Sequence, residues 1–240
     1  MFNESKEELP GSAKSLRSFI LHVIRKYLLP NIKNIKNERL LDVGGGTGDF
    51  TAEIVNILGV KEAVIVDINE SALKQASSKG FKSYKVDVAR EPLPFPDNYF
   101  DVVVMVEVVE HLYDPDYAIS EVRRVLKPGG FIVISTPNLA WWVNRLVLLL
   151  GFQPYLSSPS TRFNVGKLLR SPYECPGAPG HIRLFTFKAF KEFIELHGFR
   201  IIAMKGSAGD HRSRFITFID SILSLVPSLA AEIIVIARKV

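Results

Sequence analysis

Residues 40–50 read Leu40-Leu41-Asp42-Val43-Gly44-Gly45-Gly46-Thr47-Gly48-Asp49-Phe50. An apolar run that ends in an acid is followed by glycines at every second position and then by residues that can open a helix. This pattern predicts a buried strand, a tight turn with little side-chain bulk and a helix N-terminus. Glycine takes unusual dihedral angles and lets a ligand approach the backbone closely, so the turn is a candidate site for a nucleotide-like ligand.

Further segments end in an acid in the same way. They are Ala63–Asp67, Phe81–Val86 followed by Asp87, and Phe100–Val106 followed by Glu107. Helical patterns separate them, and Asn69 is placed to cap one of these helices. This alternation predicts an α/β fold with a doubly wound, mostly parallel sheet and helices on both faces. Since parallel strands end at one ligand-binding edge, we expect Asp42, Asp67, Asp87 and Glu107 to gather there.

The rest of the chain is predicted to complete a single domain over residues 1–240. Residues 1–38 form an N-terminal helical cap, with an amphipathic helix at 12–30 that Pro30 ends. This helix either caps the core or presents a basic face to a membrane or to the ligand. Residues 137–184 are rich in proline and are predicted to be a lid or substrate insert after the fifth strand. A helix, strand, helix and strand then close the chain.

The composition limits the possible partners and the cellular compartment of the protein. The 240 residues carry a net charge of +5, which is compatible with nucleic acid, an anionic membrane or an acidic small molecule. A single cysteine and a polar start without a signal-peptide pattern predict a cytoplasmic protein. The apolar stretches 139–152 and 215–237 contain charged residues and are not predicted to span a membrane, although the first leaves surface association open.

Several motifs together resemble the class I S-adenosylmethionine (SAM)-dependent methyltransferases. They are the glycine turn, Asp67, Asp87, Pro94–Asp101, Glu110-His111 and Leu126–Gly130, in the family's order over residues 39–136. The G-x-G-x-G spacing behind an acid also differs from the G-x-G-x-x-G of dinucleotide dehydrogenases. The resemblance implies a seven-stranded Rossmann-like methyltransferase sheet whose last strand is antiparallel, and SAM as the cofactor.

The resemblance also implies a cofactor pocket. The glycine turn leaves room for the aminoacyl end of SAM and Asp42 attracts its ammonium group, whereas Asp67 accepts hydrogen bonds from the ribose hydroxyls. Asp87 accepts a hydrogen bond from the adenine amino group, and the Val88 amide donates to a ring nitrogen of the adenine. Glu107 lines the part of the pocket that holds the methionine portion of SAM. For Asp67 and Asp87 the structural alternatives are helix capping and a turn. The expected cofactor-binding residues are Asp42, Gly44, Gly45, Gly46, Gly48, Asp67, Ile68, Asp87, Val88 and Glu107.

The catalytic candidates are His111 and His181. On a predicted helix, Glu107, Glu110 and His111 would share one face, and His111 is either a general base for an acceptor hydroxyl or a structural partner of Glu110. A looser resemblance to a glycan- and metabolite-modifying branch of the family implies that His181 or Arg183 faces the acceptor. A surface loop with incidental charge is the alternative for that segment.

The aromatic pair Trp141-Trp142 is a candidate substrate contact, together with Arg183. The pair and the apolar run after it suggest an apolar acceptor or an approach to a membrane surface. The alternative is that both tryptophans pack the insert against the core. No metal-ligand cluster is recognised, and because the methyl group of SAM is already activated by its sulfonium, transfer does not require a metal.

The sequence therefore predicts a SAM-dependent methyltransferase for a small-molecule, lipid-like or sugar-containing acceptor, with oxygen as the favoured accepting atom. The alternatives are an RNA methyltransferase and a SAM-binding protein without transferase activity. Nucleic acid is disfavoured, because the Asp/Asn-Pro-Pro-Tyr segment of amino-methylating DNA enzymes is absent after the fourth strand and no Lys/Arg-rich arm is present. The sequence makes no prediction of oligomeric state.

Overall fold

A seven-stranded sheet forms the centre of the computed structural model, which describes residues 11–32, 39–157, 159–160, 163, 165–168, 180–209 and 213–240. The strand order is β3-β2-β1-β4-β5-β7-β6, and β7 runs antiparallel to both of its neighbours. The predicted doubly wound sheet with an antiparallel last strand is confirmed. The strands are β1 (Arg39–Val43), β2 (Glu62–Asp67), β3 (Lys82–Lys85), β4 (Phe100–Val106), β5 (Leu126–Pro137), β6 (Phe199–Ser207) and β7 (Glu232–Lys239).

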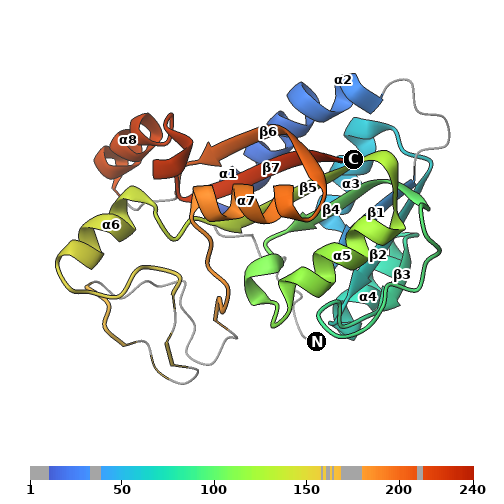
Figure 1. The fold of residues 1–240 in the computed structure, drawn as a ribbon, viewed down its shortest axis with the longest axis horizontal. Helices are drawn as coiled ribbons and strands as arrows, with labels where there is room; N and C mark the ends of the chain where they lie inside the picture. The colour runs from blue at the N-terminus through green and yellow to red at the C-terminus, as the bar shows by residue number, and fades with distance from the viewer. Residues whose placement is uncertain are drawn as a thin grey trace, which may run out of the picture.

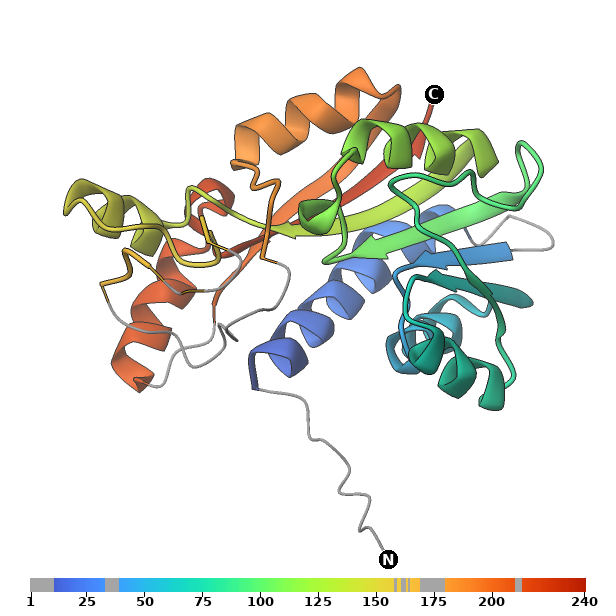
Figure 2. The same cartoon turned by 90° about the horizontal axis from the view of Figure 1, so that it is seen from below.

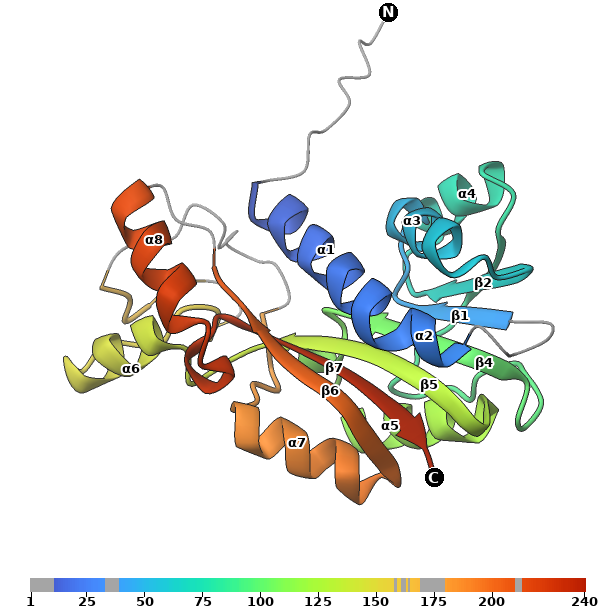
Figure 3. The ribbon, with the colours of Figure 1, turned by 90° about the horizontal axis from the view of Figure 1, so that it is seen from above.

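Helices cover both faces of this sheet (Figure 3). On one face, α1 (Gly11–Val23) and α3 (Asp49–Leu58) bury Ile20 and Ile54 against β4, and α4 (Glu70–Ser78) packs beside β2 and β3. On the other face, α5 (Pro115–Val125) and α7 (Phe187–Leu196) bury Ile119 and Phe190. The central strand β4 is buried along almost its whole length, as its unbroken apolar run predicts.

The N-terminal helix runs further than Pro30. After α1, a π-helical turn η1 (Ile24–Leu28) leads into α2 (Leu29–Ile32), where Pro30 lies in the first turn. Pro30 directly follows this π-helical turn, in which the Leu29 amide donates to the Ile24 carbonyl, and such a turn departs from the i→i−4 hydrogen bonding that a proline interrupts. The predicted end of this helix at Pro30 is therefore wrong by two residues. Its buried side chains, including Ile24 and Leu28, belong to the core, which favours the capping interpretation over an open basic face.

The helices α6 (Trp142–Leu149) and α8 (Arg214–Leu223) lie at one end of the molecule, beyond the carboxyl end of β5 (Figures 1 and 2). The 3₁₀ turn η2 (Val109–His111) follows β4, and the 3₁₀ turn η3 (Pro227–Leu229) precedes β7. Within the described ranges, no helix has the length and apolar character needed to cross a membrane.

The segment predicted as an insert leaves and rejoins the sheet at one place. Asn138 and Phe185 form a parallel bridge, and the Leu139 amide donates to the Phe185 carbonyl at 2.9 Å. Parts of the predicted regions lie outside the described residues, namely 1–10 and 33–38 of the cap and 158, 161–162, 164 and 169–179 of the insert. The single-domain assignment and the lid role of 137–184 stay predictions.

Candidate active site

The turn after β1 is built so that only glycine fits at its first position. Gly44 has a φ of +74°, and a Cβ atom there would lie 2.3 Å from a methyl carbon of Val108. Its amide donates to the Val66 carbonyl at 2.7 Å, which ties the turn to the end of β2. Gly46 has a φ of +54°, and the nearest atom to a Cβ built there is a carboxylate oxygen of Asp67 at 4.0 Å. The turn thus leaves open space above Gly46.

Asp67 is held by two backbone amides. Its Oδ2 accepts from the Gly46 amide at 2.9 Å, and its Oδ1 accepts from the Asn69 amide at 2.8 Å. The Asn69 side chain in turn caps α4 by accepting from the amides of Ser71 and Ala72, as the sequence predicts. Each Asp67 oxygen therefore has one fixed donor and retains a lone pair for a ligand hydroxyl.

A cavity of about 490 Å³ opens beside these groups. Its volume lies in the range of small-molecule sites. It contains six of the predicted cofactor-binding residues, namely Gly44, Asp67, Ile68, Asp87, Val88 and Glu107, together with the catalytic candidate His111. The other lining residues, which the sequence did not single out, are Val66, Val86, Ala89, Arg90, Val108, Leu112 and Tyr113. A second hollow, of about 620 Å³, lies around Arg39 and Glu62 at the opposite ends of the strands, away from this site.

Asp42 lies beneath the glycine turn. It is buried, and its Oδ2 accepts a hydrogen bond from the Thr51 hydroxyl at 2.7 Å. A Cβ atom on Gly45 would lie 2.8 Å from the Asp42 carboxyl carbon, so the turn covers this acid closely. Burial raises the pKa of Asp42 to about 7, against the opposing effect of the Thr51 hydrogen bond. Asp42, Gly45, Gly46 and Gly48 are not among the lining residues, and their cofactor role stays a prediction.

The sequence predicts that Glu107 lies on one helix with Glu110 and His111, but the structure does not place it there. It has a φ of +55°, and only Val109–His111 form a 3₁₀ turn. The expected helical face is therefore wrong. The Ser135 hydroxyl donates to the Glu107 carboxylate at 2.7 Å, and the Glu107 amide lies 3.2 Å from the same hydroxyl oxygen. Burial raises the pKa of Glu107 to about 7, and the Ser135 hydrogen bond opposes that rise.

Two further acids share this buried end of the site. Glu110 has no exposed surface, and its carboxylate oxygens have no hydrogen-bond partner within the described residues. Burial, and then the charge of Glu107, raises the pKa of Glu110 well above its ordinary value. Burial also raises the pKa of Glu232, with Glu107 and Glu110 adding to the effect. Three acids in mutual repulsion make this end of the site receptive to positive charge.

His111 and His181 come together although 69 residues separate them. Their ring centroids lie 4.7 Å apart, and Nε2 of His111 lies 3.8 Å from Oε1 of Glu110. The returning segment is fixed here because the amides of Ile182 and Arg183 both donate to the Glu110 carbonyl, at 2.8 and 2.9 Å. The Arg183 guanidinium donates to the Tyr113 carbonyl at 2.9 Å, which gives it a structural contact in addition to its predicted acceptor role.

The two tryptophans converge on one acid that the sequence did not single out. The indole N–H groups of Trp141 and Trp142 both donate to Oδ1 of Asp220, at 2.9 and 2.5 Å. Asp220 is fully buried on α8, and its Oδ2 accepts from the Gly209 amide at 2.7 Å. These contacts favour the interpretation in which the pair packs α6 onto α8, while substrate contact stays a prediction.

Comparisons with known proteins agree with this geometry. Residues 41–134 match a family model described as a methyltransferase domain. Over these residues the chain is a methyltransferase domain of the class I type. The cofactor of this family of domains is SAM. A SAM-dependent methyltransferase from Methanosarcina mazei has the same fold, with a TM-score of 0.60 and 21% identity over 89% of this chain and 99% of that one. The [4+2]-cyclase SpnF also superposes, with a TM-score of 0.60 and 20% identity over 99% of this chain and 84% of that one.

Curated relatives match only part of this chain. A ubiquinone/menaquinone biosynthesis C-methyltransferase, UbiE, from Photorhabdus laumondii is 39% identical over 128 residues, which are 50% of this chain and 51% of that protein. The protein of the same description from Shewanella sp. strain ANA-3 is 41% identical over 104 residues, 40% of this chain and 41% of the relative. The chain thus spans about half the length of the curated relatives that it matches.

The described residues fit SAM. The positive φ at Gly44 and the open space above Gly46 let a ligand lie against the turn. Asp67 offers two carboxylate oxygens to vicinal hydroxyls, and Ile68, Val88 and Leu112 give the cavity apolar walls for an adenine. Asp87 is held by the Ala89 amide, which donates to its Oδ1 at 3.1 Å.

Proposed function

We propose that this protein transfers the methyl group of SAM to a small-molecule acceptor. The observation that carries the proposal is the shared cavity of Gly44, Asp67 and His111, which joins a nucleoside-binding wall to a titratable imidazole. When bound, SAM supplies a methyl group activated by a sulfonium. Catalysis then needs the acceptor atom to be held in line with that methyl group and freed of its proton.

The chain's own residues supply these needs. Asp67 holds the ribose and the glycine turn makes room for the aminoacyl end, and Glu107 lies at the end of β4 where the methionine side is expected. His111 is the proposed base, because it lines the cavity beside Glu110. Histidine is the side chain whose ordinary pKa lies nearest to neutral pH. His181 lies next to His111 and is the second proposed contact for the acceptor.

A quinone-type acceptor is the most specific form of the proposal. It is supported by the relatives described as C-methyltransferases of ubiquinone and menaquinone biosynthesis, which match about half of this chain. The sequence favours oxygen as the accepting atom, whereas those relatives favour carbon. Both acceptors can use the same base, since a phenolate formed by loss of the hydroxyl proton attacks through its oxygen or through a ring carbon. Methylation at carbon then also releases the proton of that ring carbon, which restores the aromatic ring.

An apolar acceptor also agrees with the surface of α6 and α8. Leu149 is 82% exposed, Phe215 is 72% exposed and Phe218 is 65% exposed. These helices lie at the end of the molecule beyond the carboxyl end of β5 (Figure 1). We therefore propose that a lipid-like acceptor is taken up from a membrane surface. Co-flotation with anionic vesicles, lost in a Phe215→Ser/Phe218→Ser variant, would support this route, and no flotation of the parent protein would refute it.

The main test is transfer of a radiolabelled methyl group from SAM to a reduced quinone that lacks one ring methyl. Labelled product is expected, and nuclear magnetic resonance of that product separates an O-methyl from a C-methyl group. His111→Gln should lower kcat by about 10²-fold or more while SAM binding persists. Tight SAM binding without labelled product from quinols, small-molecule extracts or RNA would favour the second candidate, a SAM-binding protein without transferase activity.

A further inference from the structure

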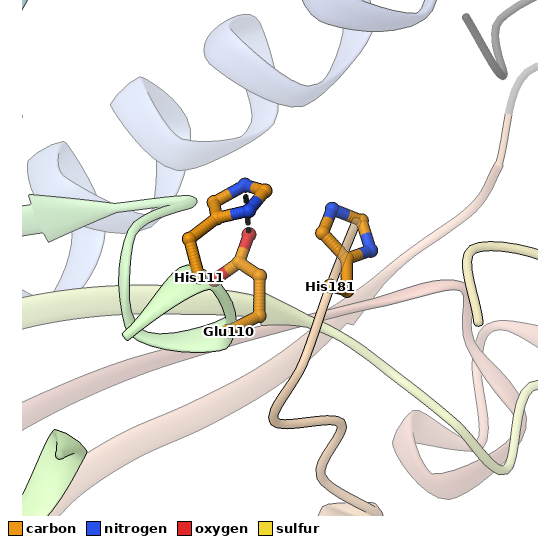
Figure 4. A group of neighbouring side chains, drawn as sticks. All are labelled: Glu110, His111 and His181. Carbon is orange, nitrogen blue, oxygen red and sulfur yellow. Dashed lines mark ion pairs between the residues drawn. The ribbon is translucent and has the colours of Figure 1, made fainter. Parts of the chain in front are cut away.

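Three side chains, of which His111 lines the cavity, lie close together. Glu110, His111 and His181 each offer one ligand atom, and these atoms lie within 4.8 Å of one another (Figure 4). Two of them come from the turn after β4, and the third comes from the segment that returns to the sheet before α7. The arrangement is thus made by the fold and not by a local sequence motif.

The ligand types suit a divalent cation. Two imidazoles and one carboxylate form a set that binds first-row divalent metals such as Mn²⁺, Fe²⁺ and Zn²⁺ and leaves coordination positions open. Bound ligand atoms about 2.1 Å from a metal lie about 3–3.5 Å from each other, so the three side chains need to close by roughly 1–2 Å. His111 is exposed enough to turn, since 38% of its side-chain surface is accessible.

Glu110 provides an independent reason to expect a ligand. It has no exposed surface, and neither carboxylate oxygen has a hydrogen-bond partner within the part of the chain that the structure describes. A buried carboxylate without such a partner is costly unless a cation or a donor accompanies it. His111 is its near neighbour at 3.8 Å, which is longer than a hydrogen bond.

His181 is oriented as metal-ligating histidines are. Its Nδ1 lies 3.0 Å from the Leu156 carbonyl, and because a carbonyl can only accept, Nδ1 carries the proton. Nε2 is then the ring nitrogen that carries a lone pair. In histidines that bind a metal through one ring nitrogen, the other ring nitrogen usually donates its hydrogen to a carbonyl, a carboxylate or water. The backbone of the same segment is held by the amides of Ile182 and Arg183 on the Glu110 carbonyl, so the imidazole is anchored from two sides.

We propose that Glu110, His111 and His181 bind a divalent cation beside the cofactor cavity. Since His111 lines that cavity, the open coordination positions are suited to an oxygen of the acceptor. This role in holding the acceptor rests on the proposed methyl transfer, whereas cation binding does not. His111 would then act as a ligand and not as a base, and a proton on the acceptor hydroxyl would be lost more easily next to the cation.

Calorimetric titration of the chelator-treated, full-length protein with Zn²⁺ and with Mn²⁺ tests the site. One saturable equivalent is expected for at least one of the two ions. The His181→Ala and Glu110→Gln variants should each lose at least about 10²-fold in affinity, and His22→Ala, an exposed histidine on α1, should bind as the parent does. No saturable binding by the parent, or unchanged affinity of the His181→Ala variant, would overturn the proposal.

SAM titration of the same samples separates this inference from the proposed function. Binding of SAM by His181→Ala with parental affinity shows that the variant is folded and that its loss of cation binding is local. A parent protein that binds the cation but not SAM would refute the proposed function and leave the cation site standing. A parent that transfers methyl groups at full rate in excess chelator would remove the acceptor role alone.

Discussion

The Gly46 amide donates to the Asp67 carboxylate at 2.9 Å, so the turn after β1 and the acid that ends β2 form one unit. Replacing Asp67 by alanine removes the proposed ribose acceptor and also frees the Gly46 amide. Because hydrogen bonds to a charged acceptor contribute about 1.5–3 kcal/mol each, SAM affinity should fall by about 10²-fold or more in calorimetry. Unchanged affinity would contradict the ribose assignment.

The matched control is Asp116→Ala, which removes an exposed acid on α5 that pairs with His197 at 3.2 Å. Its SAM affinity should equal that of the parent. Asp67→Asn is the second variant, since it keeps the size of the side chain and replaces one acceptor oxygen by a donor. An intermediate loss of affinity with a parental unfolding temperature would separate ligand binding from damage to the turn.

Gly44→Ala should lower both stability and SAM affinity. The added methyl group would meet Val108 at 2.3 Å, and the positive φ adds strain of about 1 kcal/mol or more. The double variant Gly44→Ala/Val108→Ala removes the contacting methyl groups and should recover part of the lost unfolding temperature. If the double variant is as unstable as the sum of the two single variants, the contact with Val108 is not the cause.

Asp42 makes the stability of the protein depend on pH. Its pKa is about 7 in the folded protein and near its ordinary value of 3.8 when unfolded, so the folded state binds more protons between these limits. Stability therefore falls as pH rises from about 4 to 7, by an amount on the order of 4 kcal/mol from this group. Urea unfolding of Asp42→Asn at pH 5 and pH 8 should show a smaller difference than the parent. If the change in unfolding free energy between pH 5 and pH 8 is the same in the variant and the parent, Asp42 is not the cause of the pH dependence.

Asp220→Ala should loosen the junction between α6 and α8. It leaves the indole N–H groups of Trp141 and Trp142 without their acceptor, at a cost of about 2–5 kcal/mol in unfolding free energy. Because these are the only tryptophans in the chain, intrinsic fluorescence reports the junction directly, and a red-shifted emission is expected. An emission maximum equal to that of the Asp116→Ala control would contradict the prediction.

The sheet and the cofactor side of the site could be predicted because short-range patterns determine them. Apolar runs followed by acids identify strand ends, and the parallel topology brings Asp67, Asp87 and Glu107 to one edge. The helix face expected for Glu107, Glu110 and His111 failed because Glu107 adopts a positive φ, which the sequence does not announce for a glutamate. The end of the N-terminal helix was also misplaced, because helix boundaries depend on packing.

The acceptor side could not be predicted, since its contacts join residues that lie far apart in the sequence. His111 meets His181 through backbone hydrogen bonds to Glu110, and Trp141 meets Asp220 on α8, with no periodic pattern linking either pair. The absence of a recognised metal-ligand cluster in the sequence has the same cause. Metal ligands on separate segments of the chain become neighbours only in the folded structure.

The bridge between Asn138 and Phe185 has a consequence for the evolution of this protein. Because the chain departs and returns at adjacent points, the intervening residues can be exchanged for a segment of another length without altering the pairing of β5 with β7. We propose that this segment helps to hold the acceptor, so that the cofactor site and the acceptor site can be inherited separately. A segment grafted between residues 139 and 184 from a relative should carry that relative's acceptor preference onto an unchanged SAM site.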